Sequence, residues 1–112
     1  MLYTASFWTP TDKSRYSIAL SQPKGMGLPQ LKFLAPPSQT FRDLKSGAIT
    51  WLDYRIQYCF MLDQSERDIL TNLTWVVDEA VLCCWEKDPA KCHRSLLAEW
   101  LNEHGIPTEE LQ

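Results

Sequence analysis

An uninterrupted run of apolar residues, Ala80–Trp85, stands between acidic residues in the last third of the chain. A run of this length without polar alternation is typical of a strand that is buried on both faces of a parallel sheet. A loop and then a helix follow, and the apolar side of that helix holds Leu96, Leu97, Trp100 and Leu101. We therefore expect a central strand at 80–86 that leads into a helix packed on the sheet, with Glu99 and Glu103 in water.

The rest of the chain predicts two amino-terminal strands and a helical middle. Residues 2–8 and 16–21 are short β-rich runs, and the segment between them is short for a parallel crossover, so a parallel arrangement and a hairpin both remain open. After a loop rich in proline and glycine over 22–37, cap residues and apolar spacing indicate three more helices. They are a short helix that Ser38 or Thr40 caps and Gly47 ends, a helix over 51–63 that Thr50 caps, and a helix over 66–75 that Ser65 caps.

The predicted helix over 51–63 is apolar on two faces. One face holds Leu52, Ile56, Cys59 and Phe60, and the other holds Trp51, Tyr54, Tyr58 and Met61. So wide an apolar arc predicts a helix that neighbouring elements cover on more than one side. We therefore assign Cys59 to the core.

Length and composition restrict the chain to one small domain. With 112 residues, of which 45% are hydrophobic, the segment 1–112 can form one core but not two. Together with the order of the elements, this predicts an α/β fold: a single small domain with a mainly parallel central sheet of about three strands, flanked by about four helices.

The net charge and the cysteines restrict which partners the protein can bind and in which cellular compartment we expect it. A net charge of −3 argues against extended nucleic-acid binding, which requires a basic face. A local pocket for a small anionic ligand does not require such a face, so it remains possible. No segment is apolar over the length of a membrane span, and the first residues lack the pattern of a signal peptide. We therefore expect a cytoplasmic protein whose four cysteines are reduced. The sequence leaves the oligomeric state open and points to no cofactor.

The candidate site is the junction between the apolar strand and the last helix. In parallel α/β sheets, ligands bind beyond the carboxyl ends of the strands, next to helix amino termini. Asp88 and Pro89 fit an N-cap and first turn, although the helix can also start at Cys92. Both versions bring the Cys92 thiol near the positive end of the helix, with His93 and Arg94 beside it, and each of these effects favours the thiolate.

Residue types at this junction suggest roles in chemistry and binding. The catalytic candidates are Cys92 as the thiolate, His93 as a proton carrier and Glu86 as a general acid or base. The candidates for substrate binding are Arg94 as an anion clamp, Trp85 as a stacking surface, and Thr4 and Ser21, which reach the same cleft if all three strands run parallel.

Structural roles explain the same residues equally well. A cysteine at a helix start is often a small packing residue. His93 can bond to a neighbouring carbonyl, and Arg94 can pair with Glu86 or Glu99. The spacing between Cys92 and Arg94 is also too short for the cysteine loop of a rhodanese or a phosphatase.

A zinc site would require four ligands from Cys83, Cys84, Cys92 and His93. Adjacent residues on a strand point to opposite faces, so Cys83 and Cys84 do not turn to one metal without distortion. We therefore assign no metal ligands.

The segment LCCWEKDPAKCHRSLLAEWL resembles the hallmark of the domain of unknown function 488 (DUF488) family, a strand followed by a Cys-His-Arg helix start. Other family traits recur in order: an opening LYT strand, a second strand whose motif runs from Ile18 through Ser21 to Pro23, the segment LAP at 34–36, and a helix that carries Tyr54 and Tyr58. The resemblance spans nearly the whole chain. It implies a small α/β fold with a pocket around the Cys-His-Arg segment and specifies no reaction.

Two positions depart from the family pattern. Gln22 follows Ser21, where many members carry an arginine, which weakens a two-arginine anion site. The connection between the first two strands is short, where the family commonly has a helix, which leaves the pairing of these strands in doubt.

Three functions remain open for this chain. It is an enzyme or former enzyme that acts on a small anionic or nucleotide-like ligand, a non-catalytic module that binds a ligand in the same pocket, or a protein-interaction domain with an aromatic surface. A thiol reagent separates them, because a Cys92 that reacts at about pH 6 indicates an activated thiolate and favours the enzyme.

Overall fold

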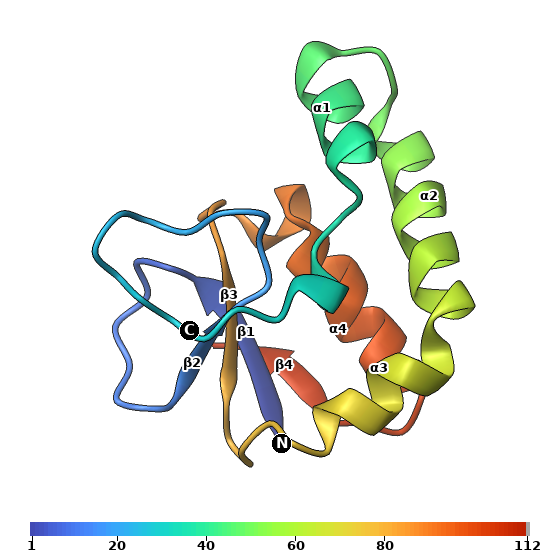
Figure 1. Ribbon diagram of the computed structural model, residues 1–112. Coiled ribbons are helices and arrows are strands. Elements are labelled where there is room, and N and C mark those ends of the chain that lie inside the picture. Colours follow the sequence, from blue (N-terminus) through green and yellow to red (C-terminus); the bar gives the residue numbers. More distant parts are fainter. Residues whose placement is uncertain (112) are drawn as a thin grey trace.

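The computed structural model describes residues 1–111 and contains a four-stranded sheet with its helices on one side (Figure 1). The strands are β1 (Leu2–Ser6), β2 (Arg15–Ser17), β3 (Val81–Cys84) and β4 (Thr108–Glu110), in the order β2-β3-β1-β4. Every neighbouring pair runs parallel. This confirms the predicted α/β fold with a parallel sheet and adds one strand to those expected.

The apolar run in the last third of the chain forms the centre of the sheet, as predicted. All four residues of β3 are buried, and the strand lies between β2 and β1. Tyr3 and Arg15 both pair with Val81, so β3 separates the two amino-terminal strands. The hairpin alternative is therefore wrong: the short segment after β1 crosses to the other side of β3, and β2 runs in the same direction as β1.

Strand β4 has no counterpart among the predicted elements. Its three residues, Thr-Glu-Glu, show no apolar alternation, and its position depends on a contact with α4 (His93–Glu103). The Asn102 side chain accepts a hydrogen bond from the backbone N–H of Thr108 at 2.8 Å and donates one to the Thr108 carbonyl at 2.9 Å. A side-chain amide thus satisfies both backbone groups of Thr108 on its outer edge and holds the strand beside β1.

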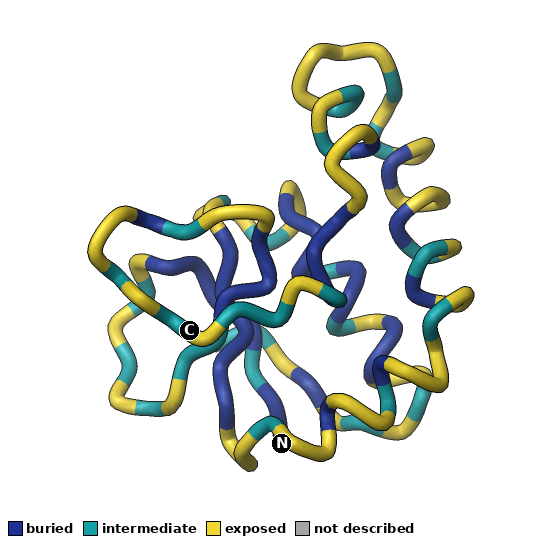
Figure 2. Tube along the Cα trace, in the orientation of Figure 1, coloured by how far each residue is buried: buried dark blue, intermediate teal, exposed yellow. Residues whose placement is uncertain are grey.

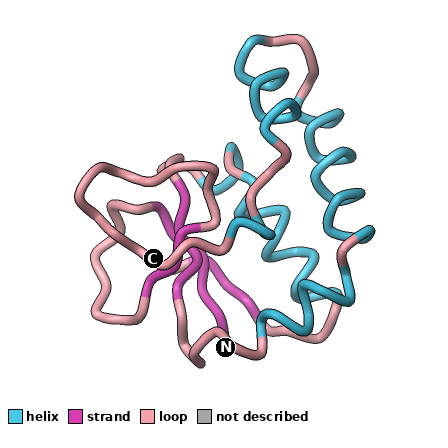
Figure 3. Tube along the Cα trace, viewed as in Figure 1, coloured by secondary structure: helices cyan, strands magenta, loops and turns pink. Residues whose placement is uncertain are grey.

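The helices form two layers on one side of the sheet. The elements besides α4 are η1 (Lys32–Leu34), α1 (Ser38–Ser46), α2 (Trp51–Gln64), α3 (Glu66–Leu73) and η2 (Pro89–Lys91). Helix α4 packs against β1 and β3, α2 packs against α4, and α1 packs against α2 (Figure 1). On the other side of the sheet, Figure 3 shows only the loops that follow β1 and β2.

Local cap chemistry fixes the predicted start of α2 and the predicted end of α1. The Thr50 hydroxyl accepts a hydrogen bond from the Asp53 N–H at 3.1 Å, and the Asp53 carboxylate accepts one from the Thr50 N–H at 3.0 Å, which is a capping box. Gly47 follows α1 with φ of 83°, in the left-handed region that glycine adopts without a steric penalty.

The predicted cap of α1 is wrong, and the predicted cap of α3 has the right position but no side-chain bond. Helix α1 begins directly after Pro37, so Ser38 and Thr40 already lie within the helix, and Thr40 instead donates a hydrogen bond to Gln57 at 2.9 Å. Ser65 occupies the N-cap position of α3, but its side chain makes no cap bond. Its backbone also ends α2 and lacks the extended conformation that a capping side chain requires.

Helix α4 buries the side that the sequence predicts. Leu97 and Leu101 are fully buried and Leu96 and Trp100 nearly so, whereas Glu99 and Glu103 are exposed. Gly105 follows with φ of 79°, in the C′ position expected of it.

Helix α2 buries only one of its two apolar faces, so the expectation that both are covered is wrong. Its buried residues are Tyr54, Tyr58 and Leu62. On the outer side, visible in Figure 2, the stripe Leu52, Ile56 and Phe60 is 59–63% exposed. Cys59 lies between the two faces and is half-buried rather than in the core. The reason is that α4 contacts α2 from one side only, and α2 is the outermost helical layer over that stretch.

Within residues 1–111, no helix is long and apolar enough to cross a membrane.

Candidate functional site

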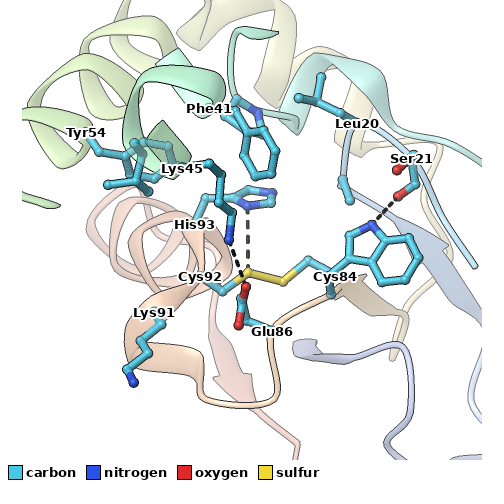
Figure 4. Close-up of a pocket in the computed structure, with 14 residues that line it drawn as sticks. Leu20, Ser21, Phe41, Lys45, Tyr54, Cys84, Glu86, Lys91, Cys92 and His93 are labelled. Carbon is cyan, nitrogen blue, oxygen red and sulfur yellow. Dashed lines mark hydrogen bonds and ion pairs between the residues drawn. A yellow bond between two sulfur atoms is a disulfide. The ribbon is translucent and has the colours of Figure 1, made fainter. Parts of the chain in front are cut away.

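A pocket of about 340 Å³ opens where β3 ends and α4 begins (Figure 4). Its walls come from the segment after β2, from α1 and α2, and from the junction between β3 and α4. The lining residues are Ala19, Leu20, Ser21, Pro36, Phe41, Leu44, Lys45, Tyr54, Cys84, Trp85, Glu86, Lys91, Cys92 and His93. Because all strands run parallel, this pocket lies at the carboxyl edge of the sheet, which is where ligand sites of such folds occur.

Five of the seven candidate residues line this pocket: Ser21, Trp85, Glu86, Cys92 and His93. The indole N–H of Trp85 donates to the Ser21 carbonyl at 2.9 Å, which ties the end of β3 to the segment after β2. The Trp85 ring is 40% exposed and packs edge-on against Phe7, with ring centres 5.4 Å apart. These two contacts fix the orientation of the Trp85 ring, which forms an aromatic surface of the pocket.

Cys92 lies directly before α4, at its N-cap, and its sulfur is bonded to that of Cys84. Asp88 caps the preceding 3-10 turn η2, where its carboxylate accepts a hydrogen bond from the Ala90 N–H at 3.0 Å. Both helix starts considered from the sequence therefore occur: Asp88 begins η2 and Cys92 begins α4. The disulfide corrects the expectation that all four cysteines are reduced. That expectation was based only on the reducing cytoplasm proposed for the protein. In the fold, the end of β3 and the start of α4 lie side by side, which brings the two cysteines together.

The orientation of His93 is fixed by a backbone carbonyl. Its Nε2 lies 2.7 Å from the Ile18 carbonyl oxygen, which only accepts hydrogen bonds, so Nε2 carries the proton. Nδ1 therefore offers its lone pair, and it faces the sulfur of Cys92 at 3.7 Å. Burial, and to a lesser extent the charge of Arg94, lower the pKa of His93 to about 4, so the ring is neutral near pH 7.

Arg94 and Thr4 do not reach the pocket, and the expected placement of both is corrected. The Arg94 side chain is fully buried and forks onto the Glu110 carboxylate, with Nε–Oε1 and Nη2–Oε2 distances of 3.0 Å. It also donates to the sulfur of Cys84 at 3.1 Å and to the carbonyls of Glu86 and Lys87. The Thr4 hydroxyl donates to Glu110 at 2.7 Å. Both side chains instead bind Glu110 of β4, the edge strand on the other side of the sheet from β2.

The cations of the pocket come instead from residues that sequence reasoning missed. Lys45 of α1 lies over the Phe41 ring and pairs with Glu86 at 3.0 Å, and both members of this pair are about half exposed. Lys91 of η2 lines the pocket and is exposed. The four-residue spacing of Phe41 and Lys45 puts both on one helix face. No sequence signal, however, indicated that this face would meet the end of β3.

Three atoms that ligate metals in proteins converge at the floor of the pocket. The sulfurs of Cys84 and Cys92 and a ring nitrogen of His93 all lie within 4.8 Å of one another. Cys83 is buried on the opposite face, where its thiol donates to the Val81 carbonyl and burial raises its pKa to about 11. The two adjacent cysteines therefore point apart, as expected, and the convergent set contains three ligands rather than the four considered from the sequence.

A comparison with protein families gives one match over most of the chain. The sequence model of DUF488-N3a, described as "Active DUF488-N3 subclade", matches residues 8–105. This range includes the whole pocket lining and ends just after α4. No curated protein and no solved structure matches the chain.

Proposed function

The chain belongs to the DUF488 family, within the DUF488-N3a subclade, and we propose that its pocket binds and acts on a small nucleotide-like ligand. Such a ligand combines a planar ring with an anionic group. The single observation that supports this most is the composition of the pocket, which gathers aromatic surfaces, two lysines and the Cys92–His93 pair at one sheet edge.

The ring of the ligand stacks on aromatic side chains. Trp85 and Phe41 both line the pocket, and Leu20 and Leu44 extend its apolar surface. Stacking of a base on an aromatic side chain contributes about 1–3 kcal/mol and requires no particular base. The apolar part of the pocket thus favours a flat, weakly polar group.

The anionic group binds to lysines rather than to Arg94. Lys45 and Lys91 line the pocket, while Arg94 already has a carboxylate partner in Glu110. The ion pair of Lys45 with Glu86 is half exposed, so a phosphate can replace the carboxylate at small cost.

The reacting centre is the Cys92–His93 pair, with Glu86 as a second proton carrier. In the dithiol form, His93 Nδ1 accepts a hydrogen bond from the Cys92 thiol, because Nε2 is already committed to the Ile18 carbonyl. The positive end of α4 and the guanidinium of Arg94 favour loss of the thiol proton. A reducing compartment such as the cytoplasm, where we propose that the protein acts, supplies this form.

A non-catalytic module that binds the same ligand is the second candidate. The observation that favours it is the Cys84–Cys92 disulfide, which leaves no free thiol at the pocket. Ligand binding is common to both candidates, so it is tested first.

Binding is tested by thermal unfolding with adenosine monophosphate, with adenosine and with inorganic phosphate. A ligand at 100 times its dissociation constant stabilises the native protein by about 2.7 kcal/mol, which raises Tm. We expect the nucleotide to stabilise more than either component. Trp85→Ala and Lys45→Ala should reduce the effect, and Leu52→Ala, on the exposed face of α2, should not. No stabilisation by any of the three probes would contradict the proposed ligand class.

Chemistry is tested by alkylation after reduction, read by mass spectrometry across pH. Cys92 should react well below the ordinary thiol pKa of about 8.5. Cys59 and Cys83 serve as internal controls, because burial raises the pKa of both thiols. A Cys92 that reacts no faster than Cys59 at about pH 6 would favour the non-catalytic module.

A further inference from the structure

The floor of the pocket has the donor set of a metal site. The sulfurs of Cys84 and Cys92 and Nδ1 of His93 come from the last residue of β3, from the N-cap directly before α4 and from the first residue of α4. We propose that the dithiol form of this protein binds a divalent metal ion of the zinc class through these three atoms, with a fourth coordination position open to the pocket. In the metal-bound form the ion takes the place of the free Cys92 thiolate as the reacting centre, so the inference rests on the proposed function only for the ligand that would meet this ion.

The separation of one ligand pair fits tetrahedral coordination. Zinc lies about 2.3 Å from thiolate sulfur and 2.0–2.1 Å from histidine nitrogen, so a tetrahedral pair of these ligands is separated by roughly 3.6 Å. The observed separation of Cys92 Sγ and His93 Nδ1 is 3.7 Å. The Cα atoms of Cys84 and Cys92 are 7.4 Å apart, beyond the usual disulfide range of about 4.4–6.8 Å. Once the disulfide is reduced, this separation of the Cα atoms leaves room for an ion between the two sulfurs.

The surroundings of each ligand match those of metal-bound residues. A ligating histidine almost always donates its second ring N–H to a carbonyl or carboxylate, and the Ile18 carbonyl fills this role for His93 at 2.7 Å. Arg94 donates to the sulfur of Cys84 at 3.1 Å, which favours the thiolate. The carboxylate of Glu110 compensates the charge of Arg94, so the guanidinium does not stand as an unbalanced cation beside the metal.

Ligand type and ligand number define the class of metal and its role. Two thiolates and one imidazole favour zinc and exclude the hard cations that prefer oxygen. Three protein ligands with one open position are typical of catalytic rather than structural zinc. The open position faces the pocket that Glu86 also lines, so a metal-bound water there has a carboxylate available to accept its proton.

Formation of the site requires reduction of the disulfide. A dithiol reductant supplies two electrons and two protons and is itself oxidised to a disulfide, which leaves Cys84 and Cys92 as thiols. The metal ion then displaces both thiol protons as the two S–metal bonds form, and His93 binds without losing a proton. The oxidised protein has one nitrogen ligand left and should not bind the ion.

The test uses Co²⁺ as a spectroscopic probe for Zn²⁺ on the full chain. The protein is reduced with a phosphine, desalted without oxygen and titrated. We expect one Co²⁺ per chain, thiolate-to-cobalt absorption in the near ultraviolet, the visible bands of tetrahedral cobalt, and displacement by Zn²⁺. Cys84→Ser and Cys92→Ser should abolish these bands. His93→Gln should weaken binding by more than the roughly 10–100-fold that loss of an outer partner costs. Cys59→Ser and the oxidised protein are the matched controls: the first should bind and the second should not.

A reduced, folded wild type without tetrahedral bands would overturn the inference, as would bands that persist in Cys92→Ser. If a serine variant does not fold, as judged by circular dichroism, protection in the wild type decides. Zn²⁺ should block alkylation of Cys84 and Cys92 while Cys59 remains reactive, and equal labelling of all three with and without Zn²⁺ would refute the site. Nucleotide binding by the oxidised protein needs no metal, so its success or failure is scored separately.

Discussion

Replacement of Arg94 should destabilise the fold rather than only weaken a ligand site. The Arg94 side chain is fully buried, while its partner Glu110 is 27% exposed at the edge of the sheet. The guanidinium joins the Glu110 carboxylate, the sulfur of Cys84 and two loop carbonyls. It thus connects β4 to β3 and to the adjoining segment that leads to η2.

The expected cost follows from these partners. Loss of one member of a buried ion pair costs about 3–5 kcal/mol, because the other charge is left without compensation. Water can reach Glu110, so Arg94→Gln should fall near the lower end, at about 3 kcal/mol. Arg94→Lys should also be costly, because an ammonium group does not fork onto a carboxylate and reach the carbonyls as well. Glu110→Gln should cost about 3–5 kcal/mol, because it leaves a fully buried cation.

Equilibrium unfolding in urea measures this prediction, since urea is uncharged and does not screen the pair. With a slope of about 1.5 kcal/mol per molar, a loss of 3 kcal/mol lowers the midpoint by about 2 M. The double variant should cost about 1–3 kcal/mol less than the sum of the single variants. Additive losses, or a loss below about 1 kcal/mol for Arg94→Gln, would show that Glu110 does not hold Arg94 in solution.

Three further predictions concern the core, pH and anions. Leu97→Ala should cost about 2–5 kcal/mol in urea unfolding because Leu97 is fully buried, whereas exposed Glu99→Ala should stay within about 0.5 kcal/mol; equal losses would mean that α4 packs with another face. Hydrogen bonds to the Trp100 carbonyl and then to Glu66 raise the pKa of His104, so its contribution to stability is complete below about pH 6.5 and is lost as the pH rises through the folded-state pKa. His104→Gln should flatten this dependence in midpoints measured from about pH 5 to 8, and an unchanged slope would contradict the assignment. Sulfate should raise the Tm of wild type and Arg94→Gln by equal increments, and a smaller increment in the variant would restore Arg94 as an anion ligand.

Features that depend on local chemistry could be predicted from the sequence. The buried run that forms β3, the Thr50 cap of α2 and the glycine at position 47 each need only neighbouring residues. The apolar side of α4 also follows from helical spacing alone. The strands are shorter than the predicted runs, because pairing in the sheet ends before β-rich composition does.

Features that depend on contacts across the fold could not be predicted. Strand β4 is polar, and a side-chain amide of α4 holds it in place. The apolar stripe of α2 fits a covered helix in sequence, yet no element of the described chain lies over it. The Cys84–Cys92 bond joins two elements that a loop separates, so spacing along the chain gave no measure of the distance between the sulfurs.

The Cys-His-Arg segment shows why sequence adjacency misled the assignment of roles. Consecutive residues at a helix start point about 100° apart, so three neighbours cannot face one cleft. Cys92 turns to the end of β3, His93 turns to the Ile18 carbonyl after β2, and Arg94 turns to Glu110 on β4. Because the missed strand β4 supplies the partner of the arginine, the same omission that shortened the predicted sheet also produced the wrong anion clamp. The segment therefore connects three strands of the sheet to one helix start, and its chemistry at the pocket reduces to the cysteine and the histidine.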